Sequence, residues 1–227
     1  MRNDVIVVDN FYTAPMRLRE LALRSQYAEI SATDYPGFAS RLKLETKALE
    51  ASFAKLIGAP LLLDKERFTW GGFRFITAES GSRPKVHADV AVDWAGMVYL
   101  TPNCDPSIGT ALYRHKATGL EGPPTDRQAR ALGFCDACDF DDKVIRPDKA
   151  DLSRWEVTTV VAPVFNRLVL FRSGENYHAP LGGCGDGPDA ARLTHVFFFS
   201  EVPHRPVKRV RISPVEILAR RTVNGLQ

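Results

Sequence analysis

A histidine and an aspartate two positions apart, His87 and Asp89, are the residues of this sequence best suited to hold a metal ion. They lie in the run KVHADVAV, whose apolar alternation predicts a β-strand. Side chains two apart on a strand point to the same side of a sheet, so both could ligate one ion. A second imidazole from a distant segment, best supplied by His178, would complete a site with two histidines and one carboxylate. Such a site leaves coordination positions open and is typical of non-haem iron(II).

The same residues have an ordinary structural interpretation. His87 could be a half-buried strand histidine bonded to Asp89, and His178 a loop histidine beside a turn. The sequence contains five histidines, so a His-x-Asp spacing can also arise by chance. The spacing alone therefore does not decide between a metal site and a structural pair.

A further polar pair, Arg192 and Thr194, opens the apolar run HVFFF. The two side chains share one face of the expected strand. A guanidinium offers a planar fork to a carboxylate, and the threonine hydroxyl adds a donor to the same group. The pair could hold a dicarboxylate, whereas the alternative is an edge-strand arginine in water.

Three segments carry these residues and a fourth, IGTALY, lies between them, in the order VHADVAVDWAGMVYLTP, IGTALY, NRLVLFRSGENYHAP and ARLTHVFFFS. From about residue 73 to residue 200 the chain resembles the 2-oxoglutarate- and iron(II)-dependent dioxygenase superfamily, especially its prolyl-hydroxylase-like branch and related bacterial proteins. The first segment looks like the family's first-ligand strand and the strand after it, and the second like its Gly-Thr strand. The third resembles its second-histidine segment, and the fourth its Arg-x-Ser/Thr cosubstrate strand.

The resemblance implies that His87, Asp89 and His178 hold iron(II). It implies a dioxygenase that uses O2 and 2-oxoglutarate to hydroxylate an unactivated C–H bond of a small molecule, an amino acid or a peptidyl side chain. Related halogenases replace the carboxylate ligand to make room for chloride, so the presence of Asp89 favours hydroxylation.

The resemblance also implies that Arg192 and Thr194 bind the distal carboxylate of 2-oxoglutarate. Tyr99 corresponds to a polar contact with the cosubstrate, with a packed aromatic as the alternative. Arg192 lies 14 positions after the second histidine, farther than is usual in the family. The glycine-rich segment LGGCGDGPD can loop out to accommodate the excess. Arg172 and Arg167 are the substitutes if Arg192 does not fill this role.

The elements that must position these residues are mainly strands. After residue 67, short apolar or alternating runs are broken by Gly, Pro, Asn and Asp. The sequence predicts a mainly β, α+β fold, in which a double-stranded β-helix (a jelly-roll or cupin-like barrel) carries N-terminal helices. We expect a strand at Val5–Val8, a helix capped by Thr13, and a second helix from Glu45 to Ile57 that ends at Gly58.

The length and the 44% hydrophobic content suit one domain over residues 1–227. Within it we expect a largely helical part at 1–66 and a barrel core at 67–215. A polar insertion at 118–155, with one helical turn near 127–132, could cover the site. The basic tail at 207–221 is expected to add a strand and a short helix.

The formal charge of +3, from 30 basic and 27 acidic residues, comes without a long basic block, so no nucleic-acid partner is expected. No apolar run approaches the roughly 18 residues that span a bilayer, and the opening MRNDVIVVDNFY lacks the pattern of a signal peptide. We therefore expect a cytoplasmic protein without a membrane partner, acting on a small-molecule or peptidyl substrate. A homodimer through the N-terminal helices is compatible with the sequence.

The remaining histidines and cysteines carry weaker signals. His195 falls on the opposite strand face from Arg192 and is expected to be structural or at the surface, while His115 and His204 have no partner spacing. The four cysteines are expected to be reduced thiols. Cys135 and Cys138 form a CxxC pair that would need further ligands, such as Cys104 or Cys184, to clip zinc, and no βαβ context supports a thioredoxin-like role.

Two other function classes stay open. A cupin-like metal isomerase or binding protein would use the same barrel without 2-oxoglutarate, and it would not need Arg192 and Thr194 in register with the metal ligands. An interaction module without catalysis would bind no iron.

Overall fold

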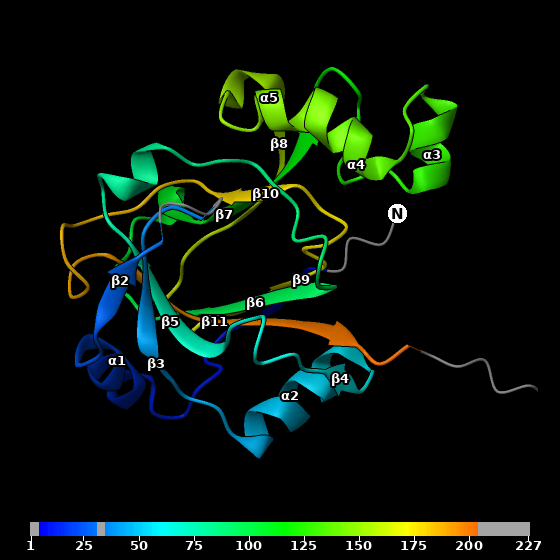
Figure 1. The fold of residues 1–227 in the computed structure, drawn as a ribbon. Coiled ribbons are helices and arrows are strands. Elements are labelled where there is room, and N and C mark those ends of the chain that lie inside the picture. Colours follow the sequence, from blue (N-terminus) through cyan, green and yellow to red (C-terminus); the bar gives the residue numbers. More distant parts are fainter. Residues whose placement is uncertain (1–4, 31–34, 204–227) are drawn as a thin grey trace, which may run out of the picture.

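Two antiparallel β-sheets with helices on their outer faces make up the described part of this computed structural model, residues 5–30 and 35–203 (Figure 1). The predicted mainly β fold with flanking helices is confirmed. The tail at 207–221 and His204 lie outside the described residues. Among the described residues, no helix has the length and apolar character needed to cross a membrane.

The larger sheet contains eight strands among the described residues, with β11 at its centre. In spatial order they are β1 (Val5–Val8), β9 (Leu168–Phe171), β6 (Trp94–Tyr99), β11 (Arg192–Glu201), β5 (Trp70–Ile76), β3 (Phe38–Lys43) and β2 (Tyr27–Glu29), with β4 (Leu61–Leu62) paired to the end of β11. In this register Thr194 lies opposite Arg74 on one side and Tyr99 on the other. Paired residues project to the same face, so the sheet gathers these three side chains on one face.

The first 66 residues supply four of these strands as well as two helices, so this part is mixed, where a largely helical one was expected. The strands β2 and β3 are half exposed and have no clear apolar alternation. Their pairing with each other and with β5 is therefore a tertiary effect that local sequence does not signal.

Helices α1 (Pro15–Leu23) and α2 (Lys47–Ile57) cover the outer face of the larger sheet (Figure 1). Phe53 of α2 is fully buried, with its ring centroid 4.7 Å from that of Phe197 and 5.3 Å from that of Trp70. Aromatic burial of this kind is a main source of stability between a helix and a sheet.

The ends of the two helices follow different rules. In α2, Thr46 accepts a hydrogen bond from the Leu49 amide, and Gly58 ends the helix at φ 73°, as expected. Helix α1 begins after Ala14 without a side-chain cap, so the predicted cap at Thr13 is wrong. Pro15 instead starts α1, because its fixed φ suits the first helical turn.

The smaller sheet contains β10 (His178–Pro180), β7 (Thr110–His115) and β8 (Trp155–Val161), in that order. Residues of β7 alternate between its two faces: Leu112 joins an apolar cluster with the larger sheet, whereas Ala111 and Tyr113 face away from it. The short helical turns η1 (Ser80–Ser82) and η2 (Pro106–Ile108) lie in the connections.

The insertion at 118–155 is more helical than the single predicted turn. It contains α3 (Asp126–Ala131), α4 (Ala137–Phe140), the π-helical turn η3 (Asp141–Ile145), α5 (Arg146–Asp148) and the turn η4 (Leu152–Arg154). Ala129, Phe140 and Ile145 pack with Ala111 and Tyr113 of the smaller sheet. Helices α3, α4 and α5 lie on the outer face of that sheet (Figure 1). The insertion therefore covers the face turned away from the larger sheet.

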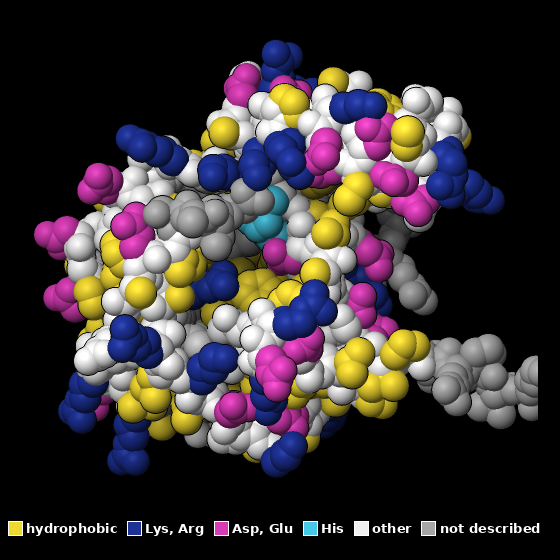
Figure 2. Space-filling view, viewed as in Figure 1, with side chains coloured by type: hydrophobic (Ala, Val, Ile, Leu, Met, Phe, Trp, Pro, Cys, Tyr) yellow, Lys and Arg dark blue, Asp and Glu magenta, His cyan; other side chains and the backbone are white. Residues whose placement is uncertain are grey.

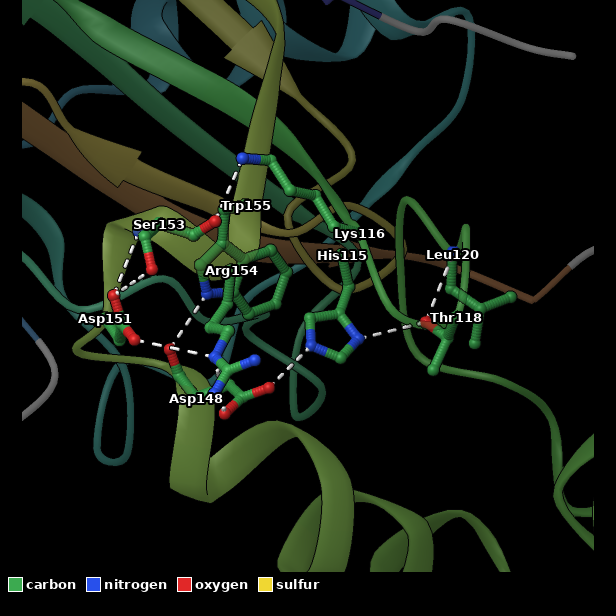
Figure 3. A network of polar contacts seen from close by, with 9 residues as sticks. All are labelled: His115, Lys116, Thr118, Leu120, Asp148, Asp151, Ser153, Arg154 and Trp155. Atoms are coloured by element: carbon green, nitrogen blue, oxygen red, sulfur yellow. Dashed lines mark hydrogen bonds and ion pairs between the residues drawn. The ribbon is translucent and has the colours of Figure 1, made fainter.

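A polar network fastens the insertion to β7 and β8 (Figure 3). His115 is fully buried, with Nε2 3.0 Å from Asp148 Oδ2 and Nδ1 3.1 Å from Thr118 Oγ1. The Trp155 indole donates to the Asp148 carbonyl at 3.0 Å. His115, which has no partner at a recognisable spacing in the sequence, is thus a structural histidine.

Candidate metal centre

A cavity of about 370 Å³ lies between the two sheets. Strands β5, β6, β9 and β11 of the larger sheet line one side, and β7 and β10 of the smaller sheet, with the segment at 87–92, line the other. Figure 2 shows it as a hollow with histidine atoms inside, apolar atoms beneath them and basic side chains at its border. No described residue of the insertion at 118–155 lines this cavity, so the structure does not support the expected cover.

His87 and Asp89 lie in an extended segment rather than in the predicted strand. Only His87 is paired, in an isolated bridge with His178, and the chain turns directly afterwards, where the Val92 amide donates to the Asp89 carbonyl at 3.0 Å. A backbone bond of 2.9 Å from Asp89 to the Ser173 carbonyl ties this turn to the segment before β10. The turn prevents a longer ladder, yet the side chains still converge, with His87 Nε2 3.7 Å from Asp89 Oδ1.

His178 reaches the same point from the smaller sheet. Backbone bonds of 2.8 and 3.1 Å link it to His87 in both directions. Its Nε2 lies 3.4 Å from Asp89 Oδ2, and one ligand atom from each of the three residues lies within 4.8 Å of the others. Among the described residues, this is the only group of three or more His, Cys, Asp or Glu side chains close enough to hold a metal ion.

Hydrogen bonds to backbone carbonyls fix the tautomer of both imidazoles. His87 Nδ1 lies 2.9 Å from the Lys85 carbonyl, and His178 Nδ1 lies 3.0 Å from the Asn176 carbonyl. Because a carbonyl oxygen only accepts, each Nδ1 carries the hydrogen and each Nε2 of the neutral ring presents a lone pair. Such carbonyl partners are usual behind metal-bound histidines.

The convergence of these lone pairs fits a bound cation. Asp89 Oδ2 is buried and accepts no hydrogen bond within the described part of the chain. At neutral pH Asp89 is a carboxylate, because the ordinary pKa of an aspartate is about 4. A carboxylate and two imidazole lone pairs facing one another are the donors that a first-row divalent metal binds.

Arg192 lies in the same cavity with its side chain almost wholly buried. Its Nη2 donates to Thr110 Oγ1 at 2.9 Å and lies 3.4 Å from the Tyr99 hydroxyl. Its Nε has no hydrogen-bond partner, and no described carboxylate forms an ion pair with it. A buried guanidinium in this state is a strong site for an added carboxylate.

The other expected anion-binding residues behave differently. Thr194 lines the cavity, but its hydroxyl donates to the Arg74 carbonyl at 3.2 Å. Tyr99 is buried beside Arg192, and its hydroxyl lies 2.8 Å from Thr110 Oγ1. The two arginines expected to replace Arg192 if it did not bind the anion form ion pairs outside the cavity. Arg167 pairs with Asp9 at 2.6 Å, and Arg172 pairs with a carboxylate of β11 at 2.7 Å. Neither lines the cavity.

Sequence reasoning missed Arg74, a second guanidinium that lines the cavity from β5. The available signal was a charged residue in the middle of the apolar run WGGFRFI, whose neighbours are buried. A long charged side chain is seldom placed in such a strand without a partner or a function.

The remaining histidine and cysteine candidates form no metal or catalytic site among the described residues. His195 is fully buried between the Tyr12 hydroxyl at 2.8 Å and the Leu44 carbonyl at 3.2 Å, so it is structural and not at the surface. All four cysteines are free, and Cys135 and Cys138 are exposed. No described cluster joins them to Cys104 or Cys184, so the zinc clip has no support in this part of the chain.

A family model described as a family of unknown function (DUF6445) matches residues 1–199. No curated protein matches the sequence. Among solved structures, the chain is similar to a prolyl-4-hydroxylase of Pseudomonas putida, with 15% identity, a TM-score of 0.46, and coverage of 89% of this chain and 95% of that one.

Two other solved structures are similar to the same extent. For a prolyl hydroxylase of Trichoplax adhaerens in complex with a hypoxia inducible factor peptide fragment, identity is 11%, the TM-score is 0.45, and coverage is 88% of this chain and 84% of that one. For HygX of Streptomyces hygroscopicus with nickel, 2-oxoglutarate and hygromycin B bound, identity is 13%, the TM-score is 0.46, and coverage is again 88% and 84%. At identities of 11–15%, these likenesses do not extend to the chemistry of the site.

Proposed function

This chain belongs to the family of unknown function DUF6445, and we propose that it is an iron(II)- and 2-oxoglutarate-dependent oxygenase that hydroxylates an unactivated C–H bond. One observation carries the proposal: a single cavity contains both the metal-binding group and a buried arginine. The group is the converging His87, Asp89 and His178, and the arginine is Arg192, which has no described carboxylate as an ion-pair partner. A metal isomerase needs the first feature but not the second. A dicarboxylate cosubstrate needs both, since one end chelates the metal and the other requires a cation.

The proposal extends to the architecture. The two antiparallel sheets that face each other across the cavity are assigned as the two halves of a double-stranded β-helix. In such a fold the ligands come from different strands and point into the space between the sheets. The placement of Asp89 beside one sheet and Arg192 within the other agrees with this assignment.

His87, Asp89 and His178 would hold iron(II). The bound metal supplies O2 activation, by which 2-oxoglutarate is oxidatively decarboxylated to succinate and CO2 while the second oxygen atom enters a substrate C–H bond. The protein's part is to keep both Nδ1 atoms protonated through Lys85 and Asn176, so that each Nε2 stays available.

Arg192 would bind the distal carboxylate of 2-oxoglutarate. Thr110 holds one nitrogen of the guanidinium and Tyr99 stands beside it, so the group is oriented before the ligand arrives. Apolar side chains, among them Met97, Phe171 and Val196, line the rest of the cavity and would keep water from the reacting centre.

The experiment is iron-dependent succinate formation from 2-oxoglutarate under air, measured with purified protein and a panel of small-molecule and peptide substrates. We expect succinate in the presence of iron(II) and its loss in Asp89→Ala. The matched control is Asp142→Ala, which removes an exposed aspartate of the insertion, outside the cavity, and should leave turnover unchanged. Succinate formation that survives Asp89→Ala would refute the assignment.

A further inference from the structure

Arg74 occupies an unusual position in the middle of β5. It lies opposite Thr194, and its side chain lines the cavity that contains the candidate metal ligands. Every other residue of β5 is buried and uncharged. Arg74 belongs neither to the proposed metal ligands nor to the proposed 2-oxoglutarate contacts.

Two aromatic rings hold the Arg74 guanidinium in place. Its central carbon lies 4.7 Å from the ring centroid of Tyr35 and 4.9 Å from that of Phe198. Aromatic faces attract a guanidinium and fix its plane, leaving the N–H groups at its edge for hydrogen bonding. The side chain is therefore oriented without using its donors.

Those donors have no described acceptor. The Nε of Arg74 is buried and makes no hydrogen bond, and no ion pair joins the guanidinium to any residue within 5–30 or 35–203. Burial lowers the pKa of Arg74, while the nearby Tyr35 and Asp89 oppose that effect. The guanidinium is thus within electrostatic reach of a metal ligand, and it lacks the anion that would offset its desolvation.

The charges around the cavity leave one positive charge unmatched. The described lining contains three arginines, Arg67, Arg74 and Arg192, and one carboxylate, Asp89. Iron(II) and the 2-oxoglutarate dianion would cancel, as would Asp89 and Arg192. Arg67 is exposed and lies 3.7 Å from Asp64. The charge of Arg74 therefore remains for the substrate.

We propose that Arg74 binds the carboxylate of the substrate, so that the substrates of this enzyme are small monoanionic carboxylic acids such as N-acyl amino acids. The inference rests on the proposed oxygenase function and names the substrate class of its site. A single unmatched charge suits a carboxylate better than a dianionic phosphate. A cavity near the lower end of the usual ligand-pocket range, shared with the cosubstrate, suits a small molecule.

Charge selection of this kind is strong in a buried site. An analogue whose carboxylate is replaced by an amide would leave the guanidinium desolvated and unpaired. We therefore expect acids to bind at least about tenfold more tightly than matched amides.

The test uses full-length protein loaded with Mn(II) in place of iron and with 2-oxoglutarate. The probes are N-acetylglycine, N-acetylalanine and N-acetylvaline, each beside its N-methylamide, and the readout is the relaxation that Mn(II) induces in the probe protons. We expect relaxation by the acids, little by the amides, and at least about tenfold weaker acid binding in Arg74→Gln. Arg67→Gln, which removes an exposed arginine of the same cavity, should retain wild-type selectivity.

Several results would overturn the inference. They are equal relaxation by acids and amides, no relaxation by any probe, or unchanged acid selectivity in Arg74→Gln. The comparison of acid with amide in wild-type protein does not depend on the folding of any variant. Arg74→Lys adds a second check, since it keeps the charge but loses the fork and should retain part of the selectivity.

Calorimetric 2-oxoglutarate binding on the same preparations separates this inference from the proposed function. If Arg74→Gln loses 2-oxoglutarate instead of the probe, Arg74 binds the cosubstrate; the inference then fails while the oxygenase proposal stands. If wild-type protein binds no 2-oxoglutarate, the proposed function fails. In that case the probes would be measured with Mn(II) alone. A preference for acids over amides that is lost in Arg74→Gln would still establish Arg74 as a carboxylate site, and the absence of such a preference would overturn the inference as well.

Discussion

Replacing Arg192 by glutamine should weaken 2-oxoglutarate binding without destabilising the folded protein. Most buried side chains contribute to stability, but the Arg192 guanidinium is buried with its Nε unpartnered and no carboxylate paired to it. Its removal relieves the cost of a desolvated charge. Thr110, which accepts its main hydrogen bond, retains a 2.8 Å contact with the Tyr99 hydroxyl. We expect the free energy of unfolding of the metal-free protein to stay within about 1 kcal/mol of wild type or to rise.

The affinity for 2-oxoglutarate should respond in the opposite direction. Loss of one partner from a buried, hydrogen-bonded charge pair costs about 2–5 kcal/mol, which corresponds to roughly 30-fold to several thousand-fold weaker binding. The assay is anaerobic calorimetric titration of 2-oxoglutarate into protein loaded with Mn(II), together with urea unfolding of the metal-free protein.

Arg172→Gln is the matched control. It breaks the ion pair of 2.7 Å with Glu201 and the stacking over Trp94, so it should lower stability by about 2 kcal/mol while 2-oxoglutarate affinity stays unchanged. A destabilised Arg192→Gln protein with wild-type 2-oxoglutarate affinity would refute the reasoning, because Arg192 would then be a structural residue.

Three further predictions concern the framework around the site. Burial lowers the pKa of His195 from 6.5 to about 4, so the unfolded chain takes up a proton at a higher pH than the folded protein. The free energy of unfolding should therefore fall by about 3 kcal/mol between pH 7 and pH 4. Urea titrations of His195→Gln should show a flatter pH dependence. Phe53→Ala empties a fully buried position between α2 and the larger sheet and should cost about 3–5 kcal/mol in urea unfolding. His115→Ala removes the contacts with Asp148 and Thr118, and should increase amide hydrogen exchange in the insertion at 118–155 without changing Mn(II) affinity.

Each of these predictions can fail. A pH dependence as steep in His195→Gln as in wild type would mean that another group carries the effect. A loss below about 1 kcal/mol for Phe53→Ala would show that the core around α2 repacks. Weakened metal binding in His115→Ala would connect the insertion to the site, against the separation of the two by the smaller sheet.

The sequence predicted the grouping of the polar residues better than the elements that carry them. His87 and Asp89 converge as an alternating strand would require, yet they lie in an extended segment with one bridge and a turn. Alternation predicts the relative direction of two side chains, but strand length depends on the partner, here only His178. The predicted strand is therefore wrong, but the two side chains point to the same place, as predicted.

The sheet edges and the insertion depended on information that local sequence lacks. Strands β2 and β3 form because β5 offers an edge, and their own residues are half exposed. The insertion was predicted from its polar composition to cover the site, but its few apolar residues pack on the outer face of the smaller sheet. Arg74 was missed because a single charged residue in an apolar strand has no motif around it, and only the cavity reveals its position.

The most direct test of the central claim is an anaerobic titration of the metal-free protein, first with iron(II) and then with 2-oxoglutarate, followed by visible absorption. Chelation of triad-bound iron(II) by the keto acid should produce a charge-transfer band that requires both additions and is absent in His87→Ala. Iron binding without the band would contradict the 2-oxoglutarate chemistry, and no iron binding would contradict the metal centre itself.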